Sequence, residues 1–122
     1  MKKILFVEDD PDQILMYQAK FEMEGLLMMV SENEKETLKL ALAEEPDLIL
    51  LDLLLRKENG LNILESLKKN ERLAKIPVII FTNYDKKELR EKSLALGAVD
   101  FIIKAKVTPK EIVERVRQIT GD

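Results

Sequence analysis

Residues 48–55 read L-I-L-L-D-L-L-L, and the class of fold follows from this stretch. The apolar run Leu48–Leu51 is too short for a helix and contains no polar residue, as expected for a strand buried on both faces. Strands of this kind occur in parallel sheets that are covered by helices on both sides. Asp52 follows the run directly, so we expect this strand to end at a carboxylate.

Similar short apolar runs recur on both sides of this stretch. They are Ile4–Val7, Leu26–Val30, Val78–Phe81 and Phe101–Ile103. The segments between the runs carry apolar residues at helical spacing and predict five amphipathic helices. Strict alternation of strand and helix predicts a doubly wound α/β fold, because crossovers between parallel strands are right-handed. We therefore predict a five-stranded parallel sheet and a single domain over residues 1–122.

Three predicted helices begin with a capping residue that is followed three positions later by Glu. These pairs are Asn33 with Glu36, Asp85 with Glu88, and Thr108 with Glu111. Such pairs satisfy backbone N–H groups that a helix leaves free in its first turn. They place the starts of three helices in the alternating pattern.

The composition excludes several classes of function. The 122 residues include no Cys and no His, which removes disulfides, thiol chemistry and imidazole bases. The net charge is -3 and Lys and Arg alternate with Glu, so we expect no nucleic-acid contact by this chain. The apolar runs are far shorter than the roughly 20 residues of a membrane span. Without a signal-like segment after Met1, we expect a cytoplasmic location.

Polar residues follow the predicted strands and indicate where the chemistry lies. Glu8 and Asp9 follow the first strand, Asp52 the third, Thr82 the fourth and Lys104 the fifth. In such sheets ligands bind beyond the carboxyl ends of the strands, where the strand order reverses. Carboxylates about 4 Å apart repel by roughly 4 kcal/mol per pair, so they require a cation. Oxygen ligands without His or Cys favour Mg²⁺, and Asp can act as a nucleophile that forms an aspartyl phosphate.

With these residues in place, the chain resembles the receiver domain of two-component response regulators, the CheY-like family. The similar motifs are I-L-F-V-E-D-D-P (4–11), L-I-L-L-D-L-L-L (48–55), N-G-L (59–61), V-I-I-F-T (78–82) and D-F-I-I-K (100–104). The resemblance covers the whole chain and implies a flavodoxin-like sheet with the strand order 2-1-3-4-5.

The resemblance implies roles for the acidic residues. Asp52 would be the phosphoacceptor and, with Asp9, a direct Mg²⁺ ligand, while Glu8 would act on the metal through water. The backbone carbonyl of Leu54 would be a further metal ligand. The domain would catalyse only its own phosphotransfer and dephosphorylation, so we do not expect an enzyme in the ordinary sense.

The resemblance also implies how a signal leaves the site. Lys104 would pair with the phosphoryl group, and Thr82 would move toward it on phosphorylation. Phe101 would be the aromatic switch residue whose burial follows that movement. The donor would be a phosphohistidine of a sensor histidine kinase or a histidine phosphotransfer protein.

Several positions depart from the family pattern. Ala105 replaces the usual Pro after Lys104, and a cis bond to Ala costs about 3 to 4 kcal/mol, so we expect a rearranged loop. Arg56 also replaces a Pro, and Asn83 a small residue. Neither Leu54 nor Tyr84 offers a carboxylate or amide to orient an attacking water. We therefore predict slow loss of phosphate from the domain itself.

The sequence suggests four candidate functions. The first is a switch whose phosphorylation alters protein contacts around the fourth helix, fifth strand and fifth helix, as a monomer or a phosphorylation-dependent dimer. The second is an adaptor that keeps the fold but works without phosphorylation. A hydrolase would need a second Asp at position 54, where Leu54 stands, and a dinucleotide enzyme would need a G-x-G-x-x-G motif. The switch fits the residues best.

Overall fold

The computed structural model describes residues 1–121, in which strands and α-helices alternate as predicted. The strands are β1 (Lys3–Val7), β2 (Leu27–Ser31), β3 (Leu48–Leu51), β4 (Val78–Thr82) and β5 (Asp100–Ile103). The helices are α1 (Pro11–Met23), α2 (Glu34–Glu44), α3 (Gly60–Lys69), α4 (Lys87–Ala95) and α5 (Pro109–Thr120), and a short 3₁₀ turn, η1 (Lys104–Lys106), follows β5. Each strand lies within one residue of its prediction.

The five strands form one parallel sheet in the order β2-β1-β3-β4-β5. Val7, the last residue of β1, pairs with Leu51, the last residue of β3. On the other side of β4, Thr82 pairs with Ile103 of β5. The predicted strand order is therefore confirmed, and the carboxyl ends of these strands reach one edge of the sheet together.

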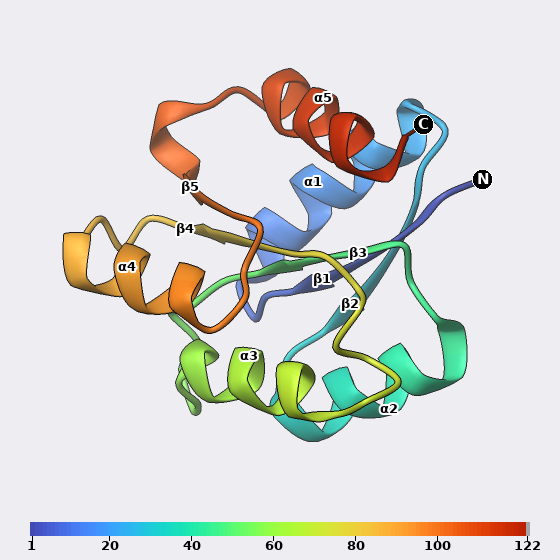
Figure 1. The fold of residues 1–122 in the computed structure, drawn as a ribbon. Coiled ribbons are helices and arrows are strands. Elements are labelled where there is room, and N and C mark those ends of the chain that lie inside the picture. The colour runs from blue at the N-terminus through green and yellow to red at the C-terminus, as the bar shows by residue number, and fades with distance from the viewer. Residues whose placement is uncertain (122) are drawn as a thin grey trace.

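Side chains of each strand alternate between two apolar cores. On one face Leu5, Ile49 and Ile80 pack against α2 and α3, with Leu89 of α4 at the margin. On the other face Phe6 and Leu50 pack against α1 and α5. Figure 1 shows this division, with α1 and α5 on one side of the sheet and α2 and α3 on the opposite side. Of the helices in residues 1–121, none has the length and apolar character to span a membrane.

Two of the three predicted caps form. The Thr108 hydroxyl accepts a hydrogen bond from the Glu111 N–H at 3.1 Å, and the Glu111 carboxylate accepts one from the Thr108 N–H at 2.8 Å. The Asn33 side chain accepts from the Glu36 N–H at 2.8 Å, so α2 also begins as predicted. Both helices thus satisfy first-turn N–H groups with side chains.

The predicted cap at Asp85 is wrong. Helix α4 begins at Lys87, and its N-cap is Lys86, which makes no capping hydrogen bond through its side chain. The Asp85 carboxylate instead lies 3.1 Å from the Lys106 ammonium, in the loop that follows β5. An ion pair between two loops has replaced a local cap.

Candidate functional site

Three predicted site residues meet at the carboxyl edge of the sheet. Lys104 Nζ lies 2.7 Å from Asp52 Oδ2, and it also donates a hydrogen bond to Glu8 Oε1. Glu8 directly follows β1 and Asp52 directly follows β3, so the parallel register brings their backbones side by side. Glu8 is 1% exposed, Asp52 4% and Lys104 6%. One ammonium therefore bridges two carboxylates in a buried position.

Burial and charge shift the protonation of this cluster. Burial raises the pKa of Glu8 to about 7, and the hydrogen bond from Lys104 offsets only part of that rise. Burial alone would lower the pKa of Lys104, but the Asp52 and Glu8 carboxylates outweigh it and hold this pKa above the ordinary value. Lys104 therefore stays charged, whereas Glu8 exchanges a proton near neutral pH.

Lys104 has a third acceptor, which the sequence analysis missed. Its ammonium donates to Gln13 Oε1 of α1 and lies 5.8 Å and 5.6 Å from the ring centroids of Phe6 and Phe81. Gln13 precedes the buried Tyr17 by four residues, so it heads the face of α1 that packs on the sheet. A polar residue at the site end of a buried stripe is a signal by which it could have been found.

Asp9 and Asp10 lie beside this cluster but outside its hydrogen bonds to Lys104. Asp9 Oδ2 accepts a hydrogen bond from the Arg56 N–H at 2.7 Å, so the carboxylate faces the loop after β3. Asp10 caps α1 and accepts from the Asp12 N–H at 2.9 Å. A cleft of about 400 Å³ opens at Asp9 and Arg56. Asp9 thus lines this cleft and is hydrogen-bonded to the loop after β3.

The donor chemistry of the site fits Mg²⁺. Within residues 1–121, no three acidic side chains are gathered closely enough to form a ready-made metal cluster. Mg²⁺ needs no such cluster, because it binds through one or two carboxylates and keeps several waters. Glu8, Asp9 and Asp52 are oxygen donors, and Lys104 is the one cation hydrogen-bonded to Glu8 and Asp52 among the described residues. The excess of negative charge leaves a role for a divalent cation.

The loop after β3 contacts both the carboxylate and the backbone of Asp52. The Leu54 N–H donates to Asp52 Oδ1 at 2.9 Å, and Leu54 forms an antiparallel bridge with Asn59. The Asn59 side chain accepts from the Leu61 N–H at 2.9 Å and begins α3. Gly60 then lies so close that an added Cβ would be 2.5 Å from the Asp52 carbonyl oxygen. The N-G-L motif therefore fixes the chain around Asp52.

A hydrogen bond joins the loops after β4 and β5, and it involves two residues that depart from the family pattern, Asn83 and Ala105. Thr82 is fully buried, and its hydroxyl accepts a hydrogen bond from the Tyr84 N–H at 3.2 Å. Asn83 Oδ1 accepts from the Ala105 N–H at 2.8 Å. Ala105 lies in the 3₁₀ turn η1, and all peptide bonds within residues 1–121 are trans. The side chain of Asn83 thus anchors the turn that follows Lys104.

Phe101 is placed inward and is covered by α4. It is 3% exposed and belongs to the core beneath α2 and α3. The Arg90 guanidinium lies 5.5 Å from its ring centroid and donates to its carbonyl at 3.3 Å. This contact was not predictable from the sequence, because the charged residues of α4 are typical of a solvated helix face. Arg90 links α4 to β5 at the predicted switch residue.

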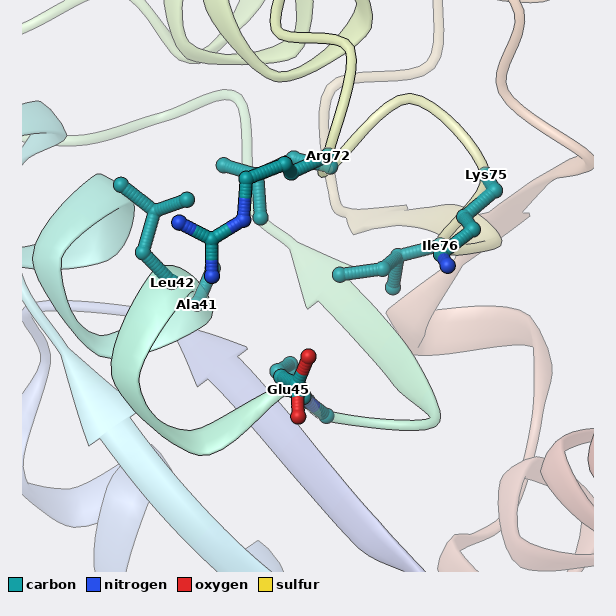
Figure 2. Close-up of a pocket in the computed structure, with 8 residues that line it drawn as sticks. Ala41, Leu42, Glu45, Arg72, Lys75 and Ile76 are labelled. Atoms are coloured by element: carbon teal, nitrogen blue, oxygen red, sulfur yellow. The ribbon is translucent and has the colours of Figure 1, made fainter.

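A separate pocket lies away from these residues. Its volume is about 170 Å³. Figure 2 shows it between the end of α2 and the connection from α3 to β4. The labelled lining residues are Ala41, Leu42, Glu45, Arg72, Lys75 and Ile76. None of the predicted site residues lines this pocket. The candidate site is therefore the buried cluster at the carboxyl edge of the sheet.

Known proteins share both the sequence pattern and the fold. The chain is 32% identical over 118 residues to the alkaline phosphatase synthesis transcriptional regulatory protein PhoP of Bacillus subtilis, covering 97% of this chain and 48% of that protein. It is 34% identical over 119 residues to the transcriptional regulatory protein CpxR of Escherichia coli, covering 98% and 49%. The chain thus spans about half the length of these two relatives.

A solved structure agrees over the full chain. The BeF3-activated N-terminal receiver domain of Klebsiella pneumoniae RstA superposes with a TM-score of 0.89 at 27% identity, covering 99% of this chain and 100% of that one. The family described as "Response regulator receiver domain" matches residues 4–117. The chain therefore belongs to the response regulator receiver domains of two-component signalling.

Proposed function

We propose that this domain is a phosphorylation-controlled switch that accepts a phosphoryl group on Asp52. The supporting observation is the contact between Asp52 Oδ2 and Lys104 Nζ at 2.7 Å, buried at the carboxyl edge of the sheet. Receiver domains are signalling modules that interact with histidine kinases and typically depend on Mg²⁺. The proposed donor is a phosphohistidine of a sensor kinase or of a histidine phosphotransfer protein.

The proposed reaction moves one phosphoryl group between two side chains. A carboxylate oxygen of Asp52 attacks phosphorus, a P–O bond forms, and the P–N bond to the donor imidazole breaks. The nitrogen of the imidazole keeps the electron pair of that bond, and because the other ring nitrogen of the phosphohistidine carries a proton, the ring leaves as neutral imidazole. Lys104 would donate to the transferred oxygens, and Thr82, the last residue of β4, would approach them through its hydroxyl after transfer.

Mg²⁺, when bound, would offset the charge that the phosphoryl group brings to this acidic edge. Asp9 and Asp52 would hold it directly together with the Leu54 carbonyl, and Glu8 would contact it through water. Glu8 must give up its proton for this, which its pKa of about 7 permits near neutral pH. The residues that would hold the metal thus follow two neighbouring strands, β1 and β3.

The proposed output is a change in protein contacts around α4, β5 and α5. Phe101 lies on β5 and touches Arg90 of α4, so a movement of Thr82 on the neighbouring β4 reaches this surface through paired strands. Phosphorylation acts only if the partner binds the two states with different affinity. The relatives named above are transcriptional regulators, and control of transcription is a proposed use of this switch.

The test is phosphorylation with acetyl phosphate and Mg²⁺, followed by intact mass measurement. We expect a gain of one phosphoryl group in the natural sequence and none in Asp52→Asn. Asp47→Asn is the matched control, because Asp47 is exposed and lies before β3, at the opposite end of the same strand. No gain in the natural sequence would favour the phosphorylation-independent adaptor.

A further inference from the structure

We propose that Gln13 is a positioning residue for phosphoryl transfer, which holds the Lys104 ammonium against Asp52. The proposal rests on the proposed function and deepens it. Gln13 belongs to α1, whereas Lys104 follows β5, so the contact joins elements from opposite ends of the chain. None of the family motifs quoted above includes this residue.

The three N–H donors of Lys104 match three acceptors. They are Glu8 Oε1, Asp52 Oδ2 and Gln13 Oε1. The rings of Phe6 and Phe81 also lie within 6 Å of the ammonium, as cation–π contacts. With every donor occupied, rotation about the last bond of the Lys104 side chain is restricted. One N–H group is thereby directed at the oxygen pair of Asp52.

The Gln13 amide is itself oriented. Its Nε2 lies 3.5 Å from Asp10 Oδ2, and its backbone N–H donates to Asp10 Oδ1 at 3.3 Å. Because the amide nitrogen can only donate, this contact turns the carbonyl oxygen of Gln13 toward Lys104. The capping carboxylate of α1 thus sets the direction of the acceptor. Asp10, Gln13, Lys104 and Asp52 form one continuous chain of hydrogen bonds.

A neutral acceptor suits this position. A third carboxylate on Lys104 would compete with Asp52 for the ammonium and add negative charge where a phosphoryl group must arrive. An apolar side chain would leave one buried N–H of a charged group without a partner. The Gln13 carbonyl satisfies the donor and adds no charge. Lys104 can then exchange its Asp52 contact for a phosphoryl oxygen without losing its place.

The test compares Gln13→Met with Gln18→Met. Both glutamines lie on α1 and are half-buried, and Gln18 Nε2 donates to the Met28 carbonyl at 3.2 Å, away from the site. Gln13→Met keeps the length of the side chain and removes the acceptor. We expect its phosphorylation by acetyl phosphate to slow about tenfold, the scale of a hydrogen bond to a charged group. Gln18→Met should keep the natural rate.

Nitrogen NMR of the Lys104 ammonium supplies a readout that a merely structural role would not move. With three acceptors, the group should exchange its protons slowly enough to give a signal, which Lys104→Met would assign. We expect Gln13→Met to lose that signal, Gln18→Met to keep it, and Gln13→Glu to keep it because an acceptor remains.

The outcomes separate this proposal from the one on which it rests. If the natural sequence takes up no phosphoryl group, the proposed function fails, whatever the ammonium signal shows. If it is phosphorylated and Gln13→Met matches Gln18→Met in rate, Gln13 has no positioning role. Absence of the ammonium signal from the natural sequence, or its persistence in Gln13→Met, would also overturn the proposal.

Discussion

Replacing Gly60 with Ala should damage the fold around Asp52, the proposed phosphoacceptor. Gly60 is the first residue of α3, and its Cα faces the backbone that carries Asp52. A Cβ placed there would lie 2.5 Å from the Asp52 carbonyl oxygen and 2.6 Å from Leu53 Cα. Both contacts are about 1 Å shorter than normal packing distances. Because both atoms belong to the backbone, no side-chain rotation relieves them.

The size of the effect follows from two opposing contributions. Overpacking of this kind costs about 1 to 3 kcal/mol, and a contact with backbone on both sides belongs at the upper end. Replacing glycine with alanine within a helix stabilises the helix by about 1 kcal/mol at most, which offsets part of this cost. We therefore expect Gly60→Ala to lower the free energy of unfolding by about 2 kcal/mol. The backbone of Asp52 should also shift, which would slow its phosphorylation.

Gly25→Ala is the matched control. Gly25 has a φ of +78° and no atom within 4 Å of an added Cβ, so the substitution carries conformational strain alone. Such strain costs about 1 kcal/mol. Urea unfolding followed by far-UV circular dichroism suits this chain, which has no Trp. If Gly60→Ala were as stable as Gly25→Ala and were phosphorylated at the natural rate, the close approach at Asp52 would be refuted.

Three further predictions concern a charge, a surface residue and a helix cap. The pKa of Glu8 is raised to about 7 from 4.5, so the metal-free fold gains stability from this group below pH 4.5 and loses it as the pH rises through 7. Relative to the Glu8→Gln variant, the free energy of unfolding of the natural sequence should fall by about 3 kcal/mol over this range of pH. A difference in stability between the two proteins that does not vary with pH would contradict this prediction. Leu54→Asn should speed the loss of phosphate from Asp52, because the introduced amide can orient an attacking water. An unchanged or slower rate in the variant would contradict the prediction that Leu54 makes dephosphorylation of the natural sequence slow. Thr108→Ala should cost about 1 kcal/mol in urea unfolding by removing the cap of α5, and no loss would mean that the bond to Glu111 contributes nothing.

The fold and the buried part of the site were predictable from local pattern. The apolar runs of β1, β3 and β4 are buried on both faces, whereas the edge strands β2 and β5 are partly exposed, and each of the five runs is followed by a polar residue. In a parallel sheet the register makes the ends of such runs neighbours in space. Asp52 and Lys104 therefore come together although they are far apart in the chain. The residue pattern, taken together with the strand order that the family resemblance implies, was enough to predict their juxtaposition.

Contacts between side chains of different elements were not predictable in this way. Asp85 has the spacing of a helix cap, but its carboxylate forms an ion pair with the ammonium of Lys106, which follows β5. Arg90 belongs to a charged helix face, but its long side chain reaches back to Phe101. Gln13 belongs to no recognisable sequence motif, although its side-chain oxygen accepts a hydrogen bond from Lys104. In each case the deciding partner is distant in sequence, so local propensity carries no information about it.

The charges at the site explain how the Glu8 and Asp52 carboxylates can be buried side by side. Lys104 neutralises one of the two buried carboxylates, and the pKa of about 7 allows Glu8 to hold a proton in place of a second cation. The Asp9 carboxylate adds no third buried charge next to Glu8 and Asp52, because it accepts a hydrogen bond from the Arg56 N–H in the loop after β3. A divalent cation would therefore displace a proton from Glu8 rather than create the pocket. In the proposed mechanism, the metal and the phosphoryl group would then act on a site in which Lys104 already contacts Asp52 and Glu8.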